Sequence, residues 1–134
     1  MNIRTAEPDD IPTLARLDLH IFPRELETSV RLGRVYVAEE PGKLLGWLRY
    51  NLFWDNIPFL NLLYILDDHR GQGFGRALTE HWEAQMKQAD YGAVLTSTQS
   101  SECAQHFYDR LGYTAVGGFF PPGEPYELIL AKKL

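Results

Sequence analysis

Three glycines at alternate positions in residues 70–75, which read RGQGFG, constrain the fold of this 134-residue chain more than any other feature. An apolar run precedes the segment and a stretch with apolar residues at helical spacing follows it, so we expect a turn from a strand into a helix. Glycine permits strained dihedrals and lets a bulky group approach the backbone. The first N–H groups of a helix lack intrahelical partners and lie at the positive end of its dipole. The segment therefore predicts a turn that binds an anion.

The side chains around this turn favour a phosphate as the anion. Arg70 and Arg76 flank the turn, and the guanidinium group matches the geometry of phosphate oxygens. Two common phosphate-binding motifs do not fit: a Walker loop needs a lysine after its last glycine, and the dinucleotide motif GxGxxG needs glycine where the chain has Arg76. A glycine-rich turn without any ligand stays open as the alternative.

The rest of the chain predicts one domain, residues 1–134, with the element order β-αα-β-β-β-α-β-α-β-β. Apolar patterning predicts strands at residues 2–5, 34–40, 44–53, 59–66, 93–98, 113–117 and 126–132. This order is typical of an α/β (α+β) fold, with a mixed, mostly antiparallel sheet and helices on both faces. Strands 59–66 and 93–98 are joined through a helix, so we expect them to be parallel neighbours. Residues 56–58 are expected to break the chain between strands.

A second motif, AxxFYxxxGY, occupies residues 104–113 in a predicted helix. Together with RxxGxG at residues 70–75 and the strand residues 63–65 before it, this motif resembles the GNAT superfamily of acetyltransferases. The two motifs cover about the C-terminal half of the chain, and the N-terminal element order agrees with the same family. The resemblance implies a GNAT-like fold.

The resemblance also implies acetyl-CoA as co-substrate, with its pyrophosphate on the glycine turn and its pantetheine arm along the preceding strand. The cofactor-binding residues implied in this way are Leu63, Tyr64, Ile65, Arg70, Gly71, Gln72, Gly73, Phe74, Gly75, Arg76 and Ser101. Ser101 stands where many members of the family have asparagine, and a simple helix cap is its alternative role.

In such enzymes a neutral amine attacks the thioester directly, and Tyr108 occupies the position of the acid that protonates the CoA thiolate. A phenol with a pKa of about 10 can protonate a thiolate whose acid has a pKa of about 8.5. A core aromatic residue beside Phe107 is the alternative role for Tyr108. The family's usual glutamate bases are replaced by Phe59 and Thr96. Candidates for the base are Asp55, His20, Glu25 and a water held by Asn61.

Aromatic residues also suggest a pocket for the acceptor amine. Strand alternation would place Tyr50 and Trp54 on one face and Trp47 and Phe53 on the other, and one of these pairs could join Phe22, Phe119 and Phe120. Core packing with a dimer contact is the alternative, so a homodimer stays open beside a monomer. No HxxxH or CxxC pattern occurs, so we expect no metal site.

The composition of the chain limits which binding partners and which cellular compartment we expect. The net charge of -5 should repel nucleic acids and mildly favours a cationic amine as substrate. No apolar run approaches the roughly 20 residues that span a bilayer, and the N-terminus lacks a signal-peptide pattern. The single cysteine, Cys103, excludes an internal disulfide and is predicted to be a core residue. We therefore expect a cytoplasmic protein without nucleic-acid or membrane partners.

The function favoured by the sequence is N-acetyl transfer from acetyl-CoA to a primary amine of a small molecule or a peptide. Two alternatives stay open. A degenerate member of the family could bind acetyl-CoA as a sensor or interaction module without turnover. A nucleotide-binding regulatory domain would instead bind ATP or NAD at the glycine turn.

Overall fold

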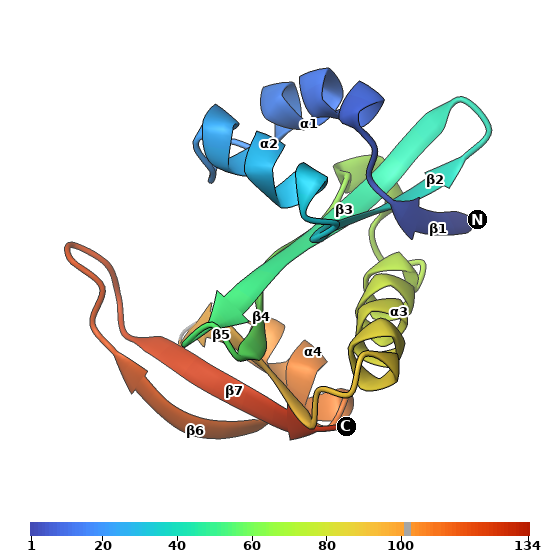
Figure 1. Cartoon of the computed structure of the whole chain (residues 1–134). Coiled ribbons are helices and arrows are strands. Elements are labelled where there is room, and N and C mark those ends of the chain that lie inside the picture. The colour runs from blue at the N-terminus through green and yellow to red at the C-terminus, as the bar shows by residue number, and fades with distance from the viewer. Residues whose placement is uncertain (101–102) are drawn as a thin grey trace. The chain divides into compact units, whose positions relative to one another are not determined.

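A computed structural model describes residues 1–100 and 103–134 of the chain (Figure 1). The elements in chain order are β1 (Asn2–Thr5), the short 3-10 helix η1 (Pro8–Asp10), α1 (Ile11–Leu17), α2 (Pro23–Arg31), β2 (Val35–Glu40), β3 (Lys43–Phe53), β4 (Ile57–Ile65), the 3-10 helix η2 (Asp67–His69), α3 (Phe74–Gln88), β5 (Ala93–Gln99), α4 (Ala104–Arg110), β6 (Thr114–Phe119) and β7 (Glu127–Lys133). The predicted element order is confirmed, and the predicted strand bounds differ from these by at most two residues.

The seven strands form a sheet with the order β1-β2-β3-β4-β5-β7-β6. As predicted, β4 and β5 pair in parallel, with Phe59 opposite Leu95 and Leu60 opposite Thr96. The pairs β1–β2, β2–β3, β5–β7 and β6–β7 are antiparallel. The prediction of a mixed, mostly antiparallel sheet is therefore confirmed.

The chain divides into two compact units. The first comprises Met1–Asn51 and Leu62–Trp82, and the second comprises Leu52–Asn61 and Glu83–Leu134. The expectation that residues 1–134 act as one domain stays a prediction. None of the helices in the described part of the chain is both long and apolar enough to cross a membrane.

The core of the first unit joins α1 and α2 to β2 and β3. Leu26 and Val30 are one helical turn apart on α2 and so share its buried face. Pro23 begins α2, where its missing N–H would have no helical partner in any case. The buried side chains of this cluster are Ala6, Leu14, Leu26, Val30, Val35, Val37 and Trp47.

A buried ion pair lies in the first unit between Asp18, which follows α1, and Arg49 on β3. Arg49 Nε donates to Asp18 Oδ2 over 2.7 Å, and Trp47 Nε1 donates to the same oxygen over 3.1 Å. Burial raises the pKa of Asp18, but the hydrogen bonds from Arg49 and Trp47 outweigh it, so the pKa of this carboxyl is lowered overall. Asp18 therefore stays charged because protein donors replace the water that burial removes.

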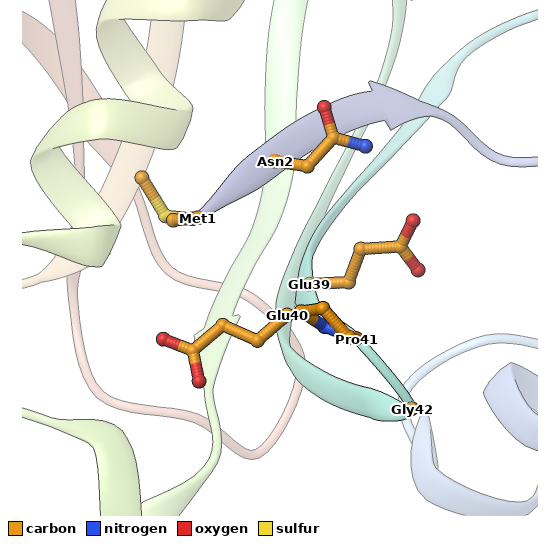
Figure 2. Close-up of a pocket in the computed structure, with 6 residues that line it drawn as sticks. All are labelled: Met1, Asn2, Glu39, Glu40, Pro41 and Gly42. Carbon is orange, nitrogen blue, oxygen red and sulfur yellow. The ribbon is translucent and has the colours of Figure 1, made fainter.

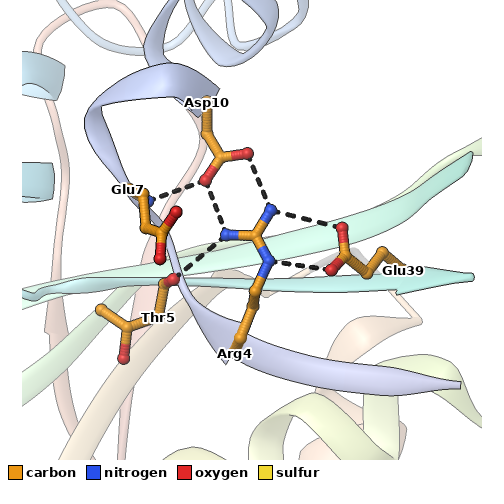
Figure 3. Close-up of polar contacts among 5 residues, drawn as sticks. All are labelled: Arg4, Thr5, Glu7, Asp10 and Glu39. Carbon is orange, nitrogen blue, oxygen red and sulfur yellow. Dashed lines mark hydrogen bonds and ion pairs between the residues drawn. The ribbon is translucent and has the colours of Figure 1, made fainter. Parts of the chain in front are cut away.

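Arg4 holds β1 in place through two carboxylates (Figure 3). Its Nη1 and Nη2 atoms donate to Asp10 over 2.7 and 2.9 Å, and its Nε and Nη2 atoms donate to Glu39 over 2.8 and 3.3 Å. Asp10 also accepts from the backbone N–H of Glu7 over 2.7 Å. The side-chain hydrogen bond from Arg4 lowers the pKa of Asp10. These contacts tie β1 to both η1 and β2.

The connection between β3 and β4 corrects two predictions from the sequence. Trp54 and Asp55 have φ of 55° and 61°, and the Asn56 N–H donates to the Phe53 carbonyl over 3.1 Å, so the strands are joined by a tight turn of type I′ geometry. Trp54 therefore lies in the turn and does not share a strand face with Tyr50. The break predicted at residues 56–58 lies earlier, at residues 54–56, because β4 already begins at residue 57.

The second unit is organised around β5 and β7, which pair along the whole of β5. Glu83 joins α3 to this region, since its carboxylate accepts from Tyr113 Oη over 2.7 Å and from Lys132 Nζ over 2.9 Å. The prediction that Cys103 belongs to the core is wrong: the side chain is exposed, because Cys103 stands just before the first residue of α4.

Replacing Asp18 should destabilise the protein in a pH-dependent manner. Asp18→Asn leaves Arg49 buried without a counter-charge, so we expect the free energy of unfolding at pH 7 to fall by about 3–5 kcal/mol in urea titrations. The pKa of Asp18 is lowered by folding. The contribution of Asp18 to the free energy of unfolding is therefore present above the ordinary carboxyl pKa. It is lost as the pH falls through the lower pKa that Asp18 has in the folded state.

The difference between the wild type and Asp18→Asn should accordingly shrink between pH 7 and pH 3. Asp9→Asn, at an exposed carboxylate of η1, is the matched control and should change stability by about 0.5 kcal/mol or less. An Asp18→Asn effect of the same size at both pH values would contradict the role assigned to the charged pair.

Candidate active site

The end of β4, which carries residues 63–65 of the predicted cofactor site, lies unusually close to β3. A Cβ atom at Gly46 would lie 2.5 Å from the carbonyl oxygen of Tyr64 and 2.6 Å from Ile65 Cδ1. One residue later, the Leu66 N–H donates to the Leu45 carbonyl over 2.9 Å. Gly46 is thus needed for the course of β4. The sequence analysis missed Gly46, although a glycine inside a strand is itself a signal of close backbone approach.

Arg70 folds back onto this end of β4. Its Nε atom donates to the Ile65 carbonyl over 2.9 Å, and its Nη2 atom lies 3.1 Å from Asp67 Oδ1. The guanidinium carbon lies 5.1 Å from the centre of the Tyr64 ring, which in turn lies 5.0 Å from the Trp47 ring. Arg70 therefore shapes the turn, and Asp67 partly neutralises its charge. Its side chain is still 55% exposed.

The backbone of the glycine turn has the left-handed conformation expected from the sequence at two of its three glycines. Gly71 and Gly73 have φ of 75° and 85°. No heavy atom of residues 1–100 or 103–134 lies within 4 Å of the Cβ position at either residue. Glycine is therefore required there by the backbone dihedral and not by lack of space. Gly75 instead lies in the first turn of α3.

The start of α3 offers backbone donors. The Ala77 N–H donates to the Gly73 carbonyl over 3.0 Å, so the N–H groups of residues 74–76 precede it and have no acceptor within the helix. Arg76 is 63% exposed and pairs with Glu80, one turn further along, over 2.7 Å. Three helix-end donors beside an exposed guanidinium can hold an anion.

The structure brings ten of the eleven predicted cofactor residues into one continuous segment of the first unit. Residues 63–65 are half-buried, residues 70–73, including Gln72, are exposed, and residues 74–76 begin α3. Ser101, the eleventh, lies outside the described residues, as does the cap that we predicted there. Tyr108 belongs to the second unit.

Tyr108 is buried in α4, with 6% of its surface exposed. The rings of Phe107 and Tyr113 meet it edge-on, with centroids at 5.0 and 5.3 Å. Thr96, a buried residue of β5, donates from Oγ1 to the Leu60 carbonyl over 3.1 Å. Tyr108 thus packs among aromatic side chains of the core, which agrees with the alternative role weighed for it and leaves the acid role a prediction.

Burial raises the pKa of Tyr108 to about 12, and the Thr96 side chain opposes this rise. Tyr108 is therefore a neutral phenol at physiological pH, which is the form that can give up a proton. Relative to an ordinary phenol with a pKa of about 10, the raised pKa makes proton donation costlier by about 3 kcal/mol.

The side chains considered for a general base are all on the surface. His20 and Glu25 are exposed in the first unit, and Asp55 and Asn61 are exposed in the second. The His20 backbone N–H donates to Asp18 Oδ1 over 3.1 Å. Within the described part of the chain, no three His, Cys, Asp or Glu side chains are grouped as metal ligands.

A cavity of about 400 Å³ lies at the N-terminal edge of the first unit, and none of the predicted cofactor residues lines it (Figure 2). It is lined by Met1, Asn2, Glu39, Glu40, Pro41 and Gly42. The side chains of Glu39 and Glu40 leave the strand in opposite directions, and Glu39 is bound to Arg4. The lining includes two glutamates and no Lys or Arg side chain, so this cavity does not fit a pyrophosphate.

Comparison with known proteins identifies the family of the chain. Residues 31–115 match the family model described as an acetyltransferase (GNAT) domain. The chain is 27% identical to an uncharacterized N-acetyltransferase of Methanocaldococcus jannaschii, across 99% of this chain and 92% of the relative.

Two solved structures share the fold. The ribosomal-protein-alanine N-acetyltransferase of Brucella melitensis has a TM-score of 0.84 and 20% identity over all of both chains. A Mycobacterium tuberculosis protein in complex with CoA has a TM-score of 0.80 and 17% identity, over 100% of this chain and 99% of that one.

The family match covers more than half of the chain and includes both the glycine turn and Tyr108. The fold, the element order and the match agree with one another. The chain belongs to the GNAT superfamily and is an acetyl-CoA-dependent acyltransferase.

Proposed function

We propose that this protein transfers the acetyl group of acetyl-CoA to a primary amine of a small molecule or a peptide. The observation that carries the proposal is the glycine turn in a GNAT chain. Gly71 and Gly73 are left-handed and lead into α3, whose first three N–H groups have no acceptor within the helix. This set of donors fits the pyrophosphate of a coenzyme A derivative.

Acetyl-CoA would be held by the eleven residues identified from the sequence. The end of β4, residues 63–65, would lie along the pantetheine arm, and residues 70–76 would surround the pyrophosphate. Arg76 supplies an exposed positive charge, whereas Arg70 contributes mainly by fixing the turn against Ile65 and Tyr64. Ser101 is included on the strength of the sequence motif alone.

When bound, acetyl-CoA supplies an activated acetyl thioester. The role that we propose for Tyr108 is to hold a proton at Oη and deliver it to the departing sulfur. Its pKa of about 12 keeps that proton in place throughout the physiological range. The acceptor must arrive as a neutral amine, so an exposed carboxylate, an imidazole or a water must take a proton from it.

The name of the Brucella melitensis neighbour makes the α-amine of a peptide a specific acceptor to test. The net charge of -5 also favours an approaching cationic amine over an anionic one. A panel of small amines and of short peptides with free N-termini, monitored by thiol release, tests both catalysis and acceptor class. N-acetylated versions of the same peptides are the matched controls. Tight CoA binding without turnover for any amine would favour the alternative that the protein is an acetyl-CoA sensor.

Gly73→Glu tests the anion site. It places a carboxylate where three N–H donors are expected to face a pyrophosphate, so we expect CoA affinity, measured by calorimetry, to fall at least about 100-fold. Gly33→Glu is the matched control because Gly33 also has a positive φ, of 71°, and no described residue within 4 Å of its Cβ position, but it lies after α2. Equal CoA affinity in both variants would overturn the assignment of the turn.

Tyr108→Phe tests the acid. The variant keeps the buried ring but removes the proton donor, so we expect kcat to fall about 100- to 10,000-fold with little change in the affinity for CoA. The pH profile of the wild type should show no loss of activity from Tyr108 below about pH 11, because its pKa is about 12. An unchanged kcat in Tyr108→Phe would show that another group protonates the thiolate.

A further inference from the structure

The last residues of the motif at residues 104–113 form the turn that ends α4, and this turn holds Tyr108. The Tyr113 N–H donates to the Tyr108 carbonyl over 3.0 Å, and the Gly112 N–H donates to the Asp109 carbonyl over 3.0 Å. Gly112 has a φ of 95°, a conformation that glycine adopts readily. These are the features of a Schellman motif, in which the side chain after the glycine contacts the last turn of the helix. Accordingly, the Tyr113 ring meets the Tyr108 ring edge-on at 5.3 Å.

Tyr113 is in turn bound to a buried carboxylate on another helix. Its Oη atom donates to Glu83 Oε2 over 2.7 Å, and Glu83 lies on α3 with 8% of its surface exposed. Lys132 Nζ on β7 donates to Glu83 Oε1 over 2.9 Å. A buried carboxylate is costly unless such charge-assisted hydrogen bonds replace its water. All these residues belong to the second unit, so the Tyr113 hydroxyl is anchored there from outside α4.

The two tyrosines of the motif therefore differ in what their hydroxyl groups can do. Burial, the hydrogen bond with Glu83 and the negative charge of Glu83 all raise the pKa of Tyr113 far above that of an ordinary phenol. A phenol has one hydroxyl hydrogen, and Tyr113 donates it to Glu83. The Tyr113 hydroxyl is thus suited to hold the ring in place and not to protonate a sulfur.

We propose that the hydrogen bond between Tyr113 and Glu83 positions Tyr108 for its role as the acid. Glu83 fixes the Tyr113 hydroxyl, the Schellman motif ties the two tyrosine backbones together, and the edge-on contact holds the Tyr108 ring. Tyr113 and Glu83 are positioning residues, since only Tyr108 would meet the departing sulfur. The inference rests on the proposed acid role of Tyr108. A displacement of about 1 Å at a reacting group can cost about 100-fold in rate, so such an anchor matters for catalysis.

A double-mutant cycle tests the proposal kinetically. Tyr113→Phe keeps the ring and leaves Glu83 paired with Lys132, so the variant should fold. We expect kcat to fall about 10- to 100-fold with unchanged CoA affinity. In the Tyr108→Phe background the same substitution should not lower kcat further, because no acid is left to position. Its effect on urea stability should be equal in both backgrounds.

The matched control is Tyr91→Phe, at a half-buried tyrosine of the same unit that follows α3, and it should leave kcat unchanged. A merely structural role for Tyr113 would lower kcat by the same factor in both backgrounds. That result, or an unchanged kcat in Tyr113→Phe, would overturn the proposal.

Nuclear magnetic resonance of ¹³C-labelled tyrosine rings gives a readout without acetyl-CoA, with the Tyr108 signals assigned by Tyr108→Phe. Glu83→Ala removes the anchor and leaves both rings unaltered. It should shift the Tyr108 ring signals and speed the ring flips, as should Tyr113→Phe, whereas Tyr91→Phe should not. Tyr108 signals that match the wild type in both variants would overturn the proposal. An unaffected kcat in Tyr108→Phe would instead refute the acid role itself, and the ring signals would still decide whether Glu83 fixes the ring.

Discussion

The end of β4 lies so close to β3 that no side chain fits between the two strands at Gly46. Much of the first unit depends on this contact. It places the Tyr64 ring against Trp47, and Trp47 in turn donates to the buried Asp18 carboxylate. On the other side of Tyr64 lies Arg70, whose guanidinium closes onto the Ile65 carbonyl. One continuous set of contacts therefore connects the buried ion pair to the residue that opens the glycine turn.

This connection gives the two arginines of the turn different roles. Arg70 is bound to the backbone and to Asp67, so it mainly sets the path of the chain into Gly71 and Gly73. Among the described residues, Arg76 is bound only to the exposed Glu80, a pair that solvent screens and that contributes little to stability. A phosphate could therefore displace Glu80 from Arg76 at small cost. The two roles differ because Arg70 is bound to a backbone carbonyl, whereas Arg76 is bound to a side chain.

The fold could be read from the sequence because its signals are local. Periodicity predicted every strand and α-helix in the observed order, and the connection through a helix predicted the parallel pairing of β4 with β5. The turn at Trp54 and Asp55 was missed because type I′ turns usually contain Asn-Gly, and a tryptophan with positive φ gives no such signal. Pro58 suggested a break, but a proline near the first residue of a strand is tolerated.

The candidate site was only partly predictable, because sequence signals are local and do not show contacts between residues that are far apart in the sequence. The glycine turn is contiguous, so its residues stand together in the sequence and in the structure. The hydrogen bond from Thr96 to Leu60 joins residues 36 positions apart, and only the parallel register of β4 and β5 shows that they meet. The sequence identified Thr96 merely as a replacement for a family glutamate.

The strained turn between β3 and β4 has an optical consequence. Of the three tryptophans, Trp47 and Trp82 are buried, whereas Trp54 is 76% exposed at the tip of the hairpin. Tryptophan fluorescence at the long-wavelength edge of the emission spectrum should therefore come mainly from Trp54. A water-soluble quencher should reach Trp54 before the two buried tryptophans. The native chain thus contains an intrinsic fluorophore that reports on one end of the β3–β4 hairpin, separately from the two tryptophans of the core.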